Sequence, residues 1–227
     1  MSRKDHHIKP YDQGTLDKLT LYYEYVRAWL PVFFNQEHIN AIQICDLFAG
    51  PGCDAEGTPG SPMLAYEAIK EFSVQNHHQI PVTLHLNEYA SEKYKQLQQW
   101  RNEVENIPHV AIELNNADFE KAFEPVKSVC RNSKIATLLF LDQNGVKFLT
   151  PNVFEFLVNC PTTDFIFFIS SAIMNRFGDE SEIKDCLMLT EDEKKQMTGK
   201  NVHRIVADAY RRYIPKDKPY YLGHFSI

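Results

Sequence analysis

Hydrophobic residues follow two spacings along this chain. Five short runs that contain Ile, Val, Leu or Phe are predicted to be strands, and the longest apolar stretches among them, IATLLFL and FIFFI, have the length of strands buried in a parallel sheet. These runs are NAIQICDLF (40–48), PVTLHLNE (81–88), HVAIELNNAD (109–118), IATLLFLD (135–142) and TDFIFFISS (163–171). Segments with helical period separate the runs. The alternation predicts an α/β fold with a doubly wound, mainly parallel sheet.

The helical segments carry recognisable start and stop signals. They span residues 14–34, 61–72, 91–104, 119–130, 151–160 and 202–214. In the first, Thr15 is placed to cap the helix, and Pro31 predicts a stop or a kink near its end. In the second, we expect Ser61 to be the N-cap and Pro62 the first helical residue. The last residues, PYYLGHFSI (219–227), are expected to form a final strand.

The order of these elements suggests how the chain is organised. We expect residues 1–38 to form an N-terminal helical lid or extension, and residues 39–227 to form one α/β domain. The polar, irregular stretch 171–200 reads as an insertion in that domain. In a doubly wound sheet the ligand binds beyond the carboxyl ends of the strands, near the point where the strand order reverses.

Composition narrows the classes of partner. The formal net charge of −6 argues against binding nucleic acid by bulk charge, although a local basic groove or a basic partner stays open. Arg204, Arg211 and Arg212 form one modest basic cluster, for which a solvated helix face is the simpler reading. The five cysteines are dispersed without a zinc-binding pattern, which together with the lack of a signal peptide favours a reducing cytoplasm. The longest apolar runs are too short to cross a membrane.

One loop stands out as a candidate ligand site. The stretch DLFAGPG, residues 46–52, follows a predicted strand directly and precedes a predicted helix. Gly50 and Gly52 allow the backbone to turn sharply and to approach a ligand closely. A dinucleotide-binding loop would have a third glycine and an acid about 20 residues later. Here the third glycine is absent, and the next acid at a strand end is Glu88, 42 positions after Asp46. The alternative is an ordinary strand-to-helix loop.

Four acids fall at the ends of four successive predicted strands. They are Asp46, Glu88, Asp118 and Asp142. The carboxyl ends of parallel strands share one edge of the sheet, so these carboxylates are expected to lie along the candidate site. A single acid in such a position is better explained as a helix N-cap or a solvated loop residue. Four in succession favour a site.

The phrase DLFAGPG resembles the first motif of class I S-adenosylmethionine-dependent methyltransferases, which have a Rossmann-like fold, and is especially similar to the DLFAG of cytosine-5 DNA methyltransferases. The resemblance implies that Glu88 binds the ribose hydroxyls, that Asp118 lies near the adenine, and that Asp142 is the catalytic residue nearest the transferred methyl group. The residues it implies in cofactor binding are Asp46, Phe48, Gly50, Pro51, Gly52, Glu88 and Asp118.

Over essentially its whole length, the chain resembles the three-Cys-motif partner protein (TcmP) family. The residues that carry the resemblance are YDQGTLDKLTLYYEYVRAWLPVF (11–33), CDLFAGPG followed by GSPMLA, and FLDQNGVKF (140–148). The family implies a bacterial or phage-related origin and a radical-SAM-like partner that carries the three cysteines. Tyr11, Lys18 and Ser61 are then candidates for a lid or a substrate contact, with a helix simply packed on the sheet as the alternative for the first two.

The chain also departs from methyltransferase patterns. Asp142 is followed by Gln143, Asn144 and Gly145, without the prolines and aromatic residue that amino-methylating DNA enzymes use. No Pro-Cys nucleophile follows this strand, and no segment remains for the last strand of the closing hairpin. Two readings therefore stay open: a methyltransferase that uses S-adenosylmethionine, and a non-catalytic partner or regulatory subunit with the same fold. A metal-dependent nuclease fits poorly, because Asp118, Asp142 and Lys147 do not surround one pair of strands.

Overall fold

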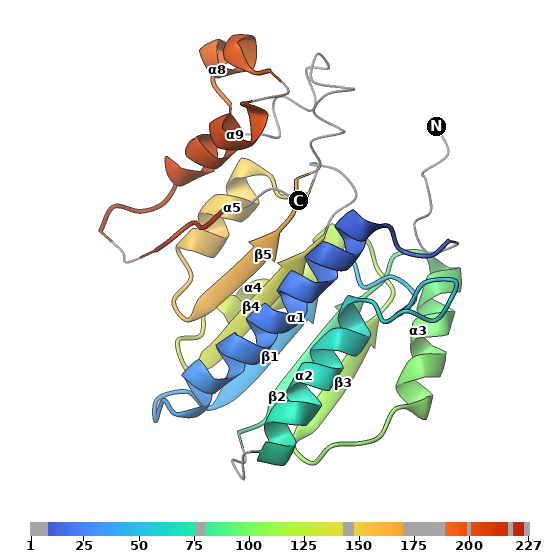
Figure 1. Cartoon of the computed structure of the whole chain (residues 1–227). Coiled ribbons are helices and arrows are strands. Elements are labelled where there is room, and N and C mark those ends of the chain that lie inside the picture. The colour runs from blue at the N-terminus through green and yellow to red at the C-terminus, as the bar shows by residue number, and fades with distance from the viewer. Residues whose placement is uncertain are drawn as a thin grey trace. The chain divides into compact units, whose positions relative to one another are not determined.

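The computed structural model describes residues 9–75, 80–142, 148–169, 189–198, 201–217 and 220–224 (Figure 1). The chain divides into two compact units. The first comprises Met1–Phe140 and Pro161–Ile166, together with Ile227, and the second comprises Leu141–Cys160 and Phe167–Ser226. In the described part of the chain, no helix is both long and apolar enough to cross a membrane.

A parallel sheet forms the centre of the first unit. Its strands are β1 (Ala41–Asp46), β2 (Val82–Asn87), β3 (Val110–Asn115), β4 (Ile135–Leu141) and β5 (Thr163–Phe167). The last residue of β4 and the last residue of β5 belong to the second unit. The strand order is β3-β2-β1-β4-β5. Ile44 of β1 is in parallel register with Leu84 on one side and Leu138 on the other. The arrangement confirms the predicted doubly wound α/β fold.

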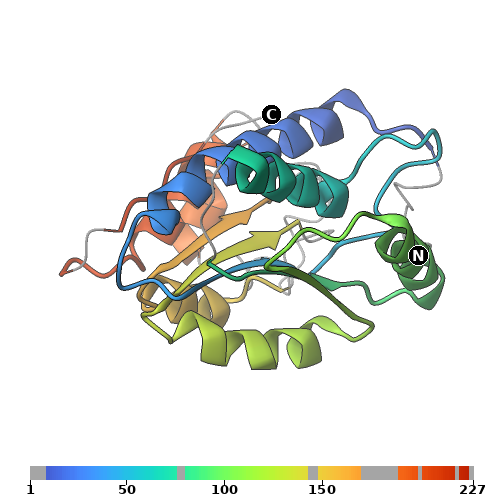
Figure 2. The ribbon, with the colours of Figure 1, turned by 90° about the horizontal axis from the view of Figure 1, so that it is seen from below.

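Helices cover both faces of this sheet. They are α1 (Gln13–Phe34), α2 (Ser61–Gln75), α3 (Ser91–Glu103) and α4 (Phe119–Cys130). Figure 2 shows α1 and α2 on one face and α4 on the opposite face. Ile42, Ile44, Leu84 and Leu138 are fully buried between these layers. Burial on two sides explains why the central strands appear in the sequence as continuous apolar runs.

Helix α1 differs from the sequence prediction at its start. Asp12, not Thr15, is the N-cap: its carboxylate accepts the backbone N–H of Thr15 at 2.9 Å. An N-cap side chain accepts the N–H of a residue two or three positions later, and Thr15 lies three positions after Asp12. Both residue types are good N-caps, so the sequence alone did not decide which of the two caps the helix. The helix continues through Pro31 to Phe34 rather than stopping there.

The second unit contains three described helices, α5 (Pro151–Val158), α8 (Glu191–Gln196) and α9 (Val202–Arg211). An aromatic cluster packs inside it, with the ring of Tyr210 4.9 Å from that of Phe154 and 5.2 Å from that of Phe167. The strand expected over residues 219–227 is wrong for residues 220–224, which form no strand. The Tyr220 hydroxyl donates to the carbonyl of Leu157 instead. Most of the expected insertion, residues 171–188 and 199–200 of the range 171–200, lies outside the described residues.

Candidate functional site

The glycine loop is built from backbone conformations that favour glycine. Gly50 has φ 65° and Gly52 has φ 98°, both in the left-handed region. The N–H of Ala49 donates to the carbonyl of Asn87 at 3.0 Å, and the N–H of Gly50 donates to Oε2 of Glu88 at 2.9 Å. The loop after β1 is thereby joined to the end of β2. A side chain with a branched Cβ at Gly50 would strain this connection.

Glu88 orders two loops at once. Its Oε2 accepts the Gly50 N–H, and its Oε1 accepts the N–H of Ala90 at 2.6 Å. An ionised carboxylate has about four acceptor positions, so each oxygen keeps capacity for one further hydrogen bond. The residue is half-buried at the carboxyl edge of the sheet. With this geometry, the carboxylate can hold the loop and also accept hydrogen bonds from two hydroxyl groups of a ligand.

Asp46 lies deeper, at the end of β1, and none of its surface is exposed. Its Oδ2 accepts the hydroxyl of Ser61 at 2.5 Å, and its Oδ1 accepts the N–H of Phe48 at 3.1 Å. The prediction that Ser61 is the N-cap of α2 is wrong: Ser61 is the first helical residue, and its hydroxyl donates to Asp46. Asp46 thus fixes the start of the loop and the start of the helix that follows it.

A second acid in the loop, Asp54, was not singled out from the sequence. It is 6% exposed, and its carboxylate accepts backbone N–H groups from Tyr11 at 2.8 Å, Glu56 at 2.9 Å and Thr58 at 2.8 Å. Burial opposes ionisation, but the hydrogen bonds from Tyr11, Thr58 and Glu56 outweigh it and lower the pKa of Asp54. The available signal was an Asp three residues before Gly57, a pattern typical of an Asx-type turn.

The segment before α1 packs against this loop. A Cβ at Gly60 would lie 2.9 Å from the carbonyl oxygen of Gly52 and 3.0 Å from the hydroxyl of Tyr11. Glycine is therefore required where the loop closes, and Tyr11 lies beside it. Lys18 is half-buried on α1, and its place in a lid stays a prediction.

Aromatic rings line the same edge of the sheet. Phe48 is stacked on Phe119 with ring centroids 5.4 Å apart and an interplanar angle of 10°. Phe119 is in turn stacked on Phe123 at 5.3 Å. Tyr89, the residue after Glu88, is 66% exposed. A large aromatic side chain exposed beside a strand-end acid offers a planar surface to a ligand. Tyr89 was not singled out from the sequence, although its position directly after Glu88 was a signal that could have identified it.

Asp118 serves as the N-cap of α4. Its Oδ1 accepts the N–H of Lys121 at 3.0 Å, and its Oδ2 lies 3.0 Å from the ammonium of the same residue. The backbone N–H of Lys121, followed by its side chain, lowers the pKa of Asp118. This is the helix-cap role that the sequence left as an alternative, and a contact with adenine stays a prediction. The neighbouring Asn116 donates to the carbonyls of Glu88 and Tyr89, which joins the β2 and β3 loops.

Asp142, the candidate catalytic residue, directly follows Leu141 at the end of β4 and is half-buried. It belongs to the second unit, and its catalytic role stays a prediction. The rest of the motif, residues 143–147 including Lys147, lies outside the described residues. Within the described ranges, no group of three or more His, Cys, Asp and Glu side chains is arranged to hold a metal ion.

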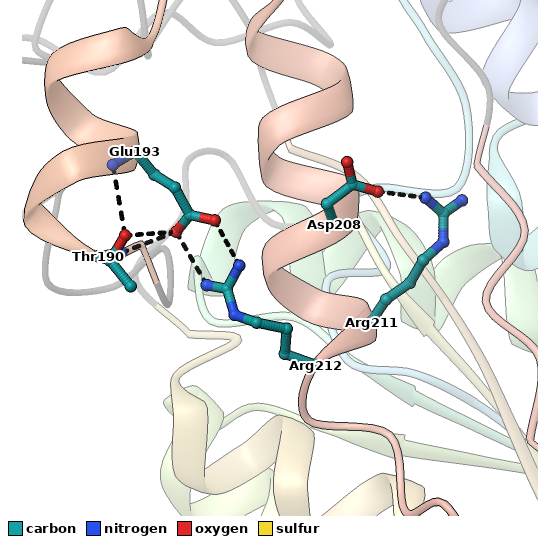
Figure 3. A network of polar contacts seen from close by, with 5 residues as sticks. All are labelled: Thr190, Glu193, Asp208, Arg211 and Arg212. Carbon is teal, nitrogen blue, oxygen red and sulfur yellow. Dashed lines mark hydrogen bonds and ion pairs between the residues drawn. The ribbon is translucent and has the colours of Figure 1, made fainter.

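Two of the three arginines in the basic cluster, Arg211 and Arg212, are paired with acids (Figure 3). The two terminal guanidinium nitrogens of Arg212 donate to the two carboxylate oxygens of Glu193, with Nη2 2.9 Å from Oε2. Nη1 of Arg211 lies 2.7 Å from Oδ1 of Asp208. The hydrogen bonds from Arg212 lower the pKa of Glu193 to about 2, despite the opposing effect of burial. Arg211 and Arg212 therefore belong to an ion-paired helix surface, as the simpler sequence reading expected.

Comparison with protein-family models and with curated proteins finds no match to this chain.

Proposed function

We propose that this chain binds S-adenosylmethionine at the carboxyl edge of its sheet and acts as a methyltransferase-like protein of the TcmP type. The observation that carries the proposal is the bond from Gly50 N–H to Glu88, which joins a left-handed glycine loop to a carboxylate with remaining acceptor capacity. Two adjacent hydroxyls, such as those of a ribose, match the two oxygens of Glu88. The loop and the acid end neighbouring strands of a doubly wound sheet, which is where such folds bind nucleotides.

The described residues fit the other parts of this cofactor. The half-buried ring of Phe48, already stacked on Phe119, suits one face of a purine, and the exposed Tyr89 offers a second surface. Asp46 and Asp54 act through the loop, because the first is fully buried and the second is bound to backbone N–H groups. When bound, S-adenosylmethionine supplies a methyl group that is already activated. The task left to the chain is alignment, with Asp142 proposed to accept a proton or hydrogen bond from the methyl acceptor.

A second function has its own support. The sequence after Asp142 lacks the prolines and aromatic residue of base-methylating enzymes, and Asp118 is engaged as a helix cap. These features favour a partner or regulatory subunit for a radical-SAM-like three-Cys-motif protein. The same cofactor site would then serve assembly rather than methyl transfer.

Calorimetric titration with S-adenosylmethionine tests the cofactor. We expect micromolar binding by the wild-type chain and its loss in Gly50→Val, since valine does not tolerate a φ of 65°. Gly57→Val is the matched control, because Gly57 also has a positive φ, 84°, but has open space where a Cβ would lie and makes no bond to Glu88. Equal loss in both variants would point to general loop damage instead of a cofactor contact.

Glu88→Gln tests the carboxylate itself. The amide keeps one acceptor oxygen but cannot accept both loop N–H groups and two ligand hydroxyls, so affinity should fall while Glu113→Gln, an exposed site on β3, leaves it unchanged. No binding by a well-folded wild-type chain would contradict the cofactor proposal. Binding seen only when the three-Cys-motif protein is added would support the subunit function.

A further inference from the structure

Tyr22 on α1 holds a hydroxyl group that has no hydrogen-bond partner among the residues that the structure describes. The side chain is completely buried, and its ring lies 4.0 Å from that of Phe140. Buried polar groups are almost always paired, because an unpaired one forgoes the hydrogen bonds that water would supply. The ring alone would pack equally well as phenylalanine, so packing does not account for the hydroxyl.

The position of Tyr22 coincides with the reversal of the strand order. From β1 the chain proceeds outward to β2 and β3, then returns to place β4 and β5 on the other side. Asp46 at the end of β1 is in register with Phe140 of β4, the residue on which Tyr22 packs. Ligands of doubly wound sheets bind at this switch point. Burial and the nearby charge of Asp46 raise the pKa of Tyr22, so the phenol remains protonated and can donate.

The proposed cofactor places a hydrogen-bond acceptor at this point. Glu88 suits the ribose at the end of β2, and Phe48 stacked on Phe119 suits the base. The opposite end of the molecule, its amino-acid group, then extends toward β1 and β4. That group carries a carboxylate able to accept a hydrogen bond.

We propose that Tyr22 is a positioning residue that donates its hydroxyl hydrogen bond to the carboxylate of the amino-acid end of S-adenosylmethionine; the proposal rests on the cofactor proposed above. The hydroxyl is closed off from solvent in this conformation. Engagement therefore requires α1 to shift when the ligand binds, and binding and the packing of α1 become coupled.

Tyr22→Phe separates this function from a structural one. Tyr23→Phe is the matched control, because the neighbouring hydroxyl has a partner, Glu71, at 2.6 Å. In urea titrations of the free proteins we expect the unfolding midpoint to rise for Tyr22→Phe, which removes an unpaired group, and to fall for Tyr23→Phe. A merely structural tyrosine would lose stability and affinity together, whereas the proposal predicts changes of opposite sign.

Ligand truncation then locates the contact. We expect Tyr22→Phe to weaken the binding of S-adenosylhomocysteine about tenfold. The binding of 5′-methylthioadenosine, which lacks the amino-acid end, should not change. Tyr23→Phe should change neither. Three results for Tyr22→Phe would each overturn the proposal while the cofactor assignment stands. They are an unchanged affinity for S-adenosylhomocysteine, an equal loss of affinity for both ligands, and a lower unfolding midpoint. If the wild-type chain binds neither compound, the cofactor assignment fails and this inference fails with it.

Discussion

The hydroxyl of Ser61 donates to the carboxylate of Asp46 across 2.5 Å, where both residues are buried. The bond joins the last residue of β1 to the first residue of α2, and the entire glycine loop lies between them. Because Asp46 has no exposed surface, water cannot replace a donor that is removed. The conformation of the loop therefore depends on a hydrogen bond formed before any ligand arrives.

Ser61→Ala should destabilise the protein by about 2 kcal/mol, the typical value of a hydrogen bond to a charged group. Ser73→Ala is the control on the same helix, since the Ser73 hydroxyl only returns to the carbonyl of Ile69 four residues earlier. That change should stay within about 0.5 kcal/mol, because alanine is also the better helix former. Urea titration measures both. Equal effects would mean that Ser61 matters only as a helix residue.

Asp54→Ala should release the segment before α1 from the loop. The variant removes the acceptor for the N–H groups of Tyr11, Glu56 and Thr58, so amide hydrogen exchange should accelerate at Tyr11 and across residues 52–60. Glu56→Gln is the control, because Glu56 contributes only its backbone N–H to Asp54. Unchanged exchange at Tyr11 in Asp54→Ala would show that other contacts hold the segment.

The lowered pKa of Asp54 adds a pH dependence to the same contact. A carboxylate whose folded-state pKa lies below its unfolded value stabilises the protein above the unfolded value, and that stability is lost as pH falls through the folded pKa. The protection of the Tyr11 amide, measured against its intrinsic exchange rate at each pH, should therefore hold at neutral pH and be lost only in acid, below the ordinary aspartate range. Loss of this protection already near neutral pH would contradict the assignment.

The fold was predictable because its strongest signals are local. Ile42, Ile44, Leu84 and Leu138 lie in apolar runs whose length and composition indicate buried parallel strands, and the structure places them between helices. Gly50 and Gly52 likewise carry the positive φ angles that their place after β1 suggested. In each case the residue's own chemistry restricts the conformations it can adopt.

The contacts within the candidate site were less predictable because they join distant positions. Asp54 binds the N–H of Tyr11, 43 residues away, and Gly50 donates to Glu88, 38 residues away. A strand-end acid has the same sequence context whether it caps a helix, as Asp118 does, or holds a loop, as Glu88 does. Only the packed neighbours decide between these roles.

His109 provides a test of stored backbone strain. Its φ is 64°, in the left-handed region that non-glycine residues seldom adopt, and its side chain is exposed just before β3. His109→Gly should stabilise the protein by up to about 1 kcal/mol, as relief of strain is partly offset by the greater freedom of glycine when unfolded. His38→Gly, at an exposed turn residue without a positive φ, should destabilise it. Thermal unfolding compares the two, and a loss of stability in His109→Gly would show that its imidazole makes a compensating contact.

Asp164 on β5 should weaken the protein at neutral pH. Its Oδ2 accepts the indole N–H of Trp29 at 2.7 Å, yet burial outweighs this hydrogen bond and raises the pKa of the carboxyl group. When the folded pKa is raised, the group's stabilising contribution is present below the unfolded pKa and is lost as pH rises through the folded one. Above the folded pKa the charge is therefore held in an unfavourable setting.

Asp164→Asn keeps an oxygen acceptor for Trp29 and removes the charge, so it should be more stable than the wild type at neutral pH. The difference in unfolding free energy between the variant and the wild type should shrink as the pH falls toward about 3.9, where the carboxyl group of the unfolded protein also takes up its proton. Urea titrations followed by the fluorescence of Trp29, in a Trp100→Phe background, measure both conditions. Asp17→Asn, at an exposed carboxylate on α1, controls for the change of net charge. A neutral-pH loss of stability confined to Asp164→Asn would mean that the ionised carboxylate is required to hold Trp29 and, through it, α1 against β5.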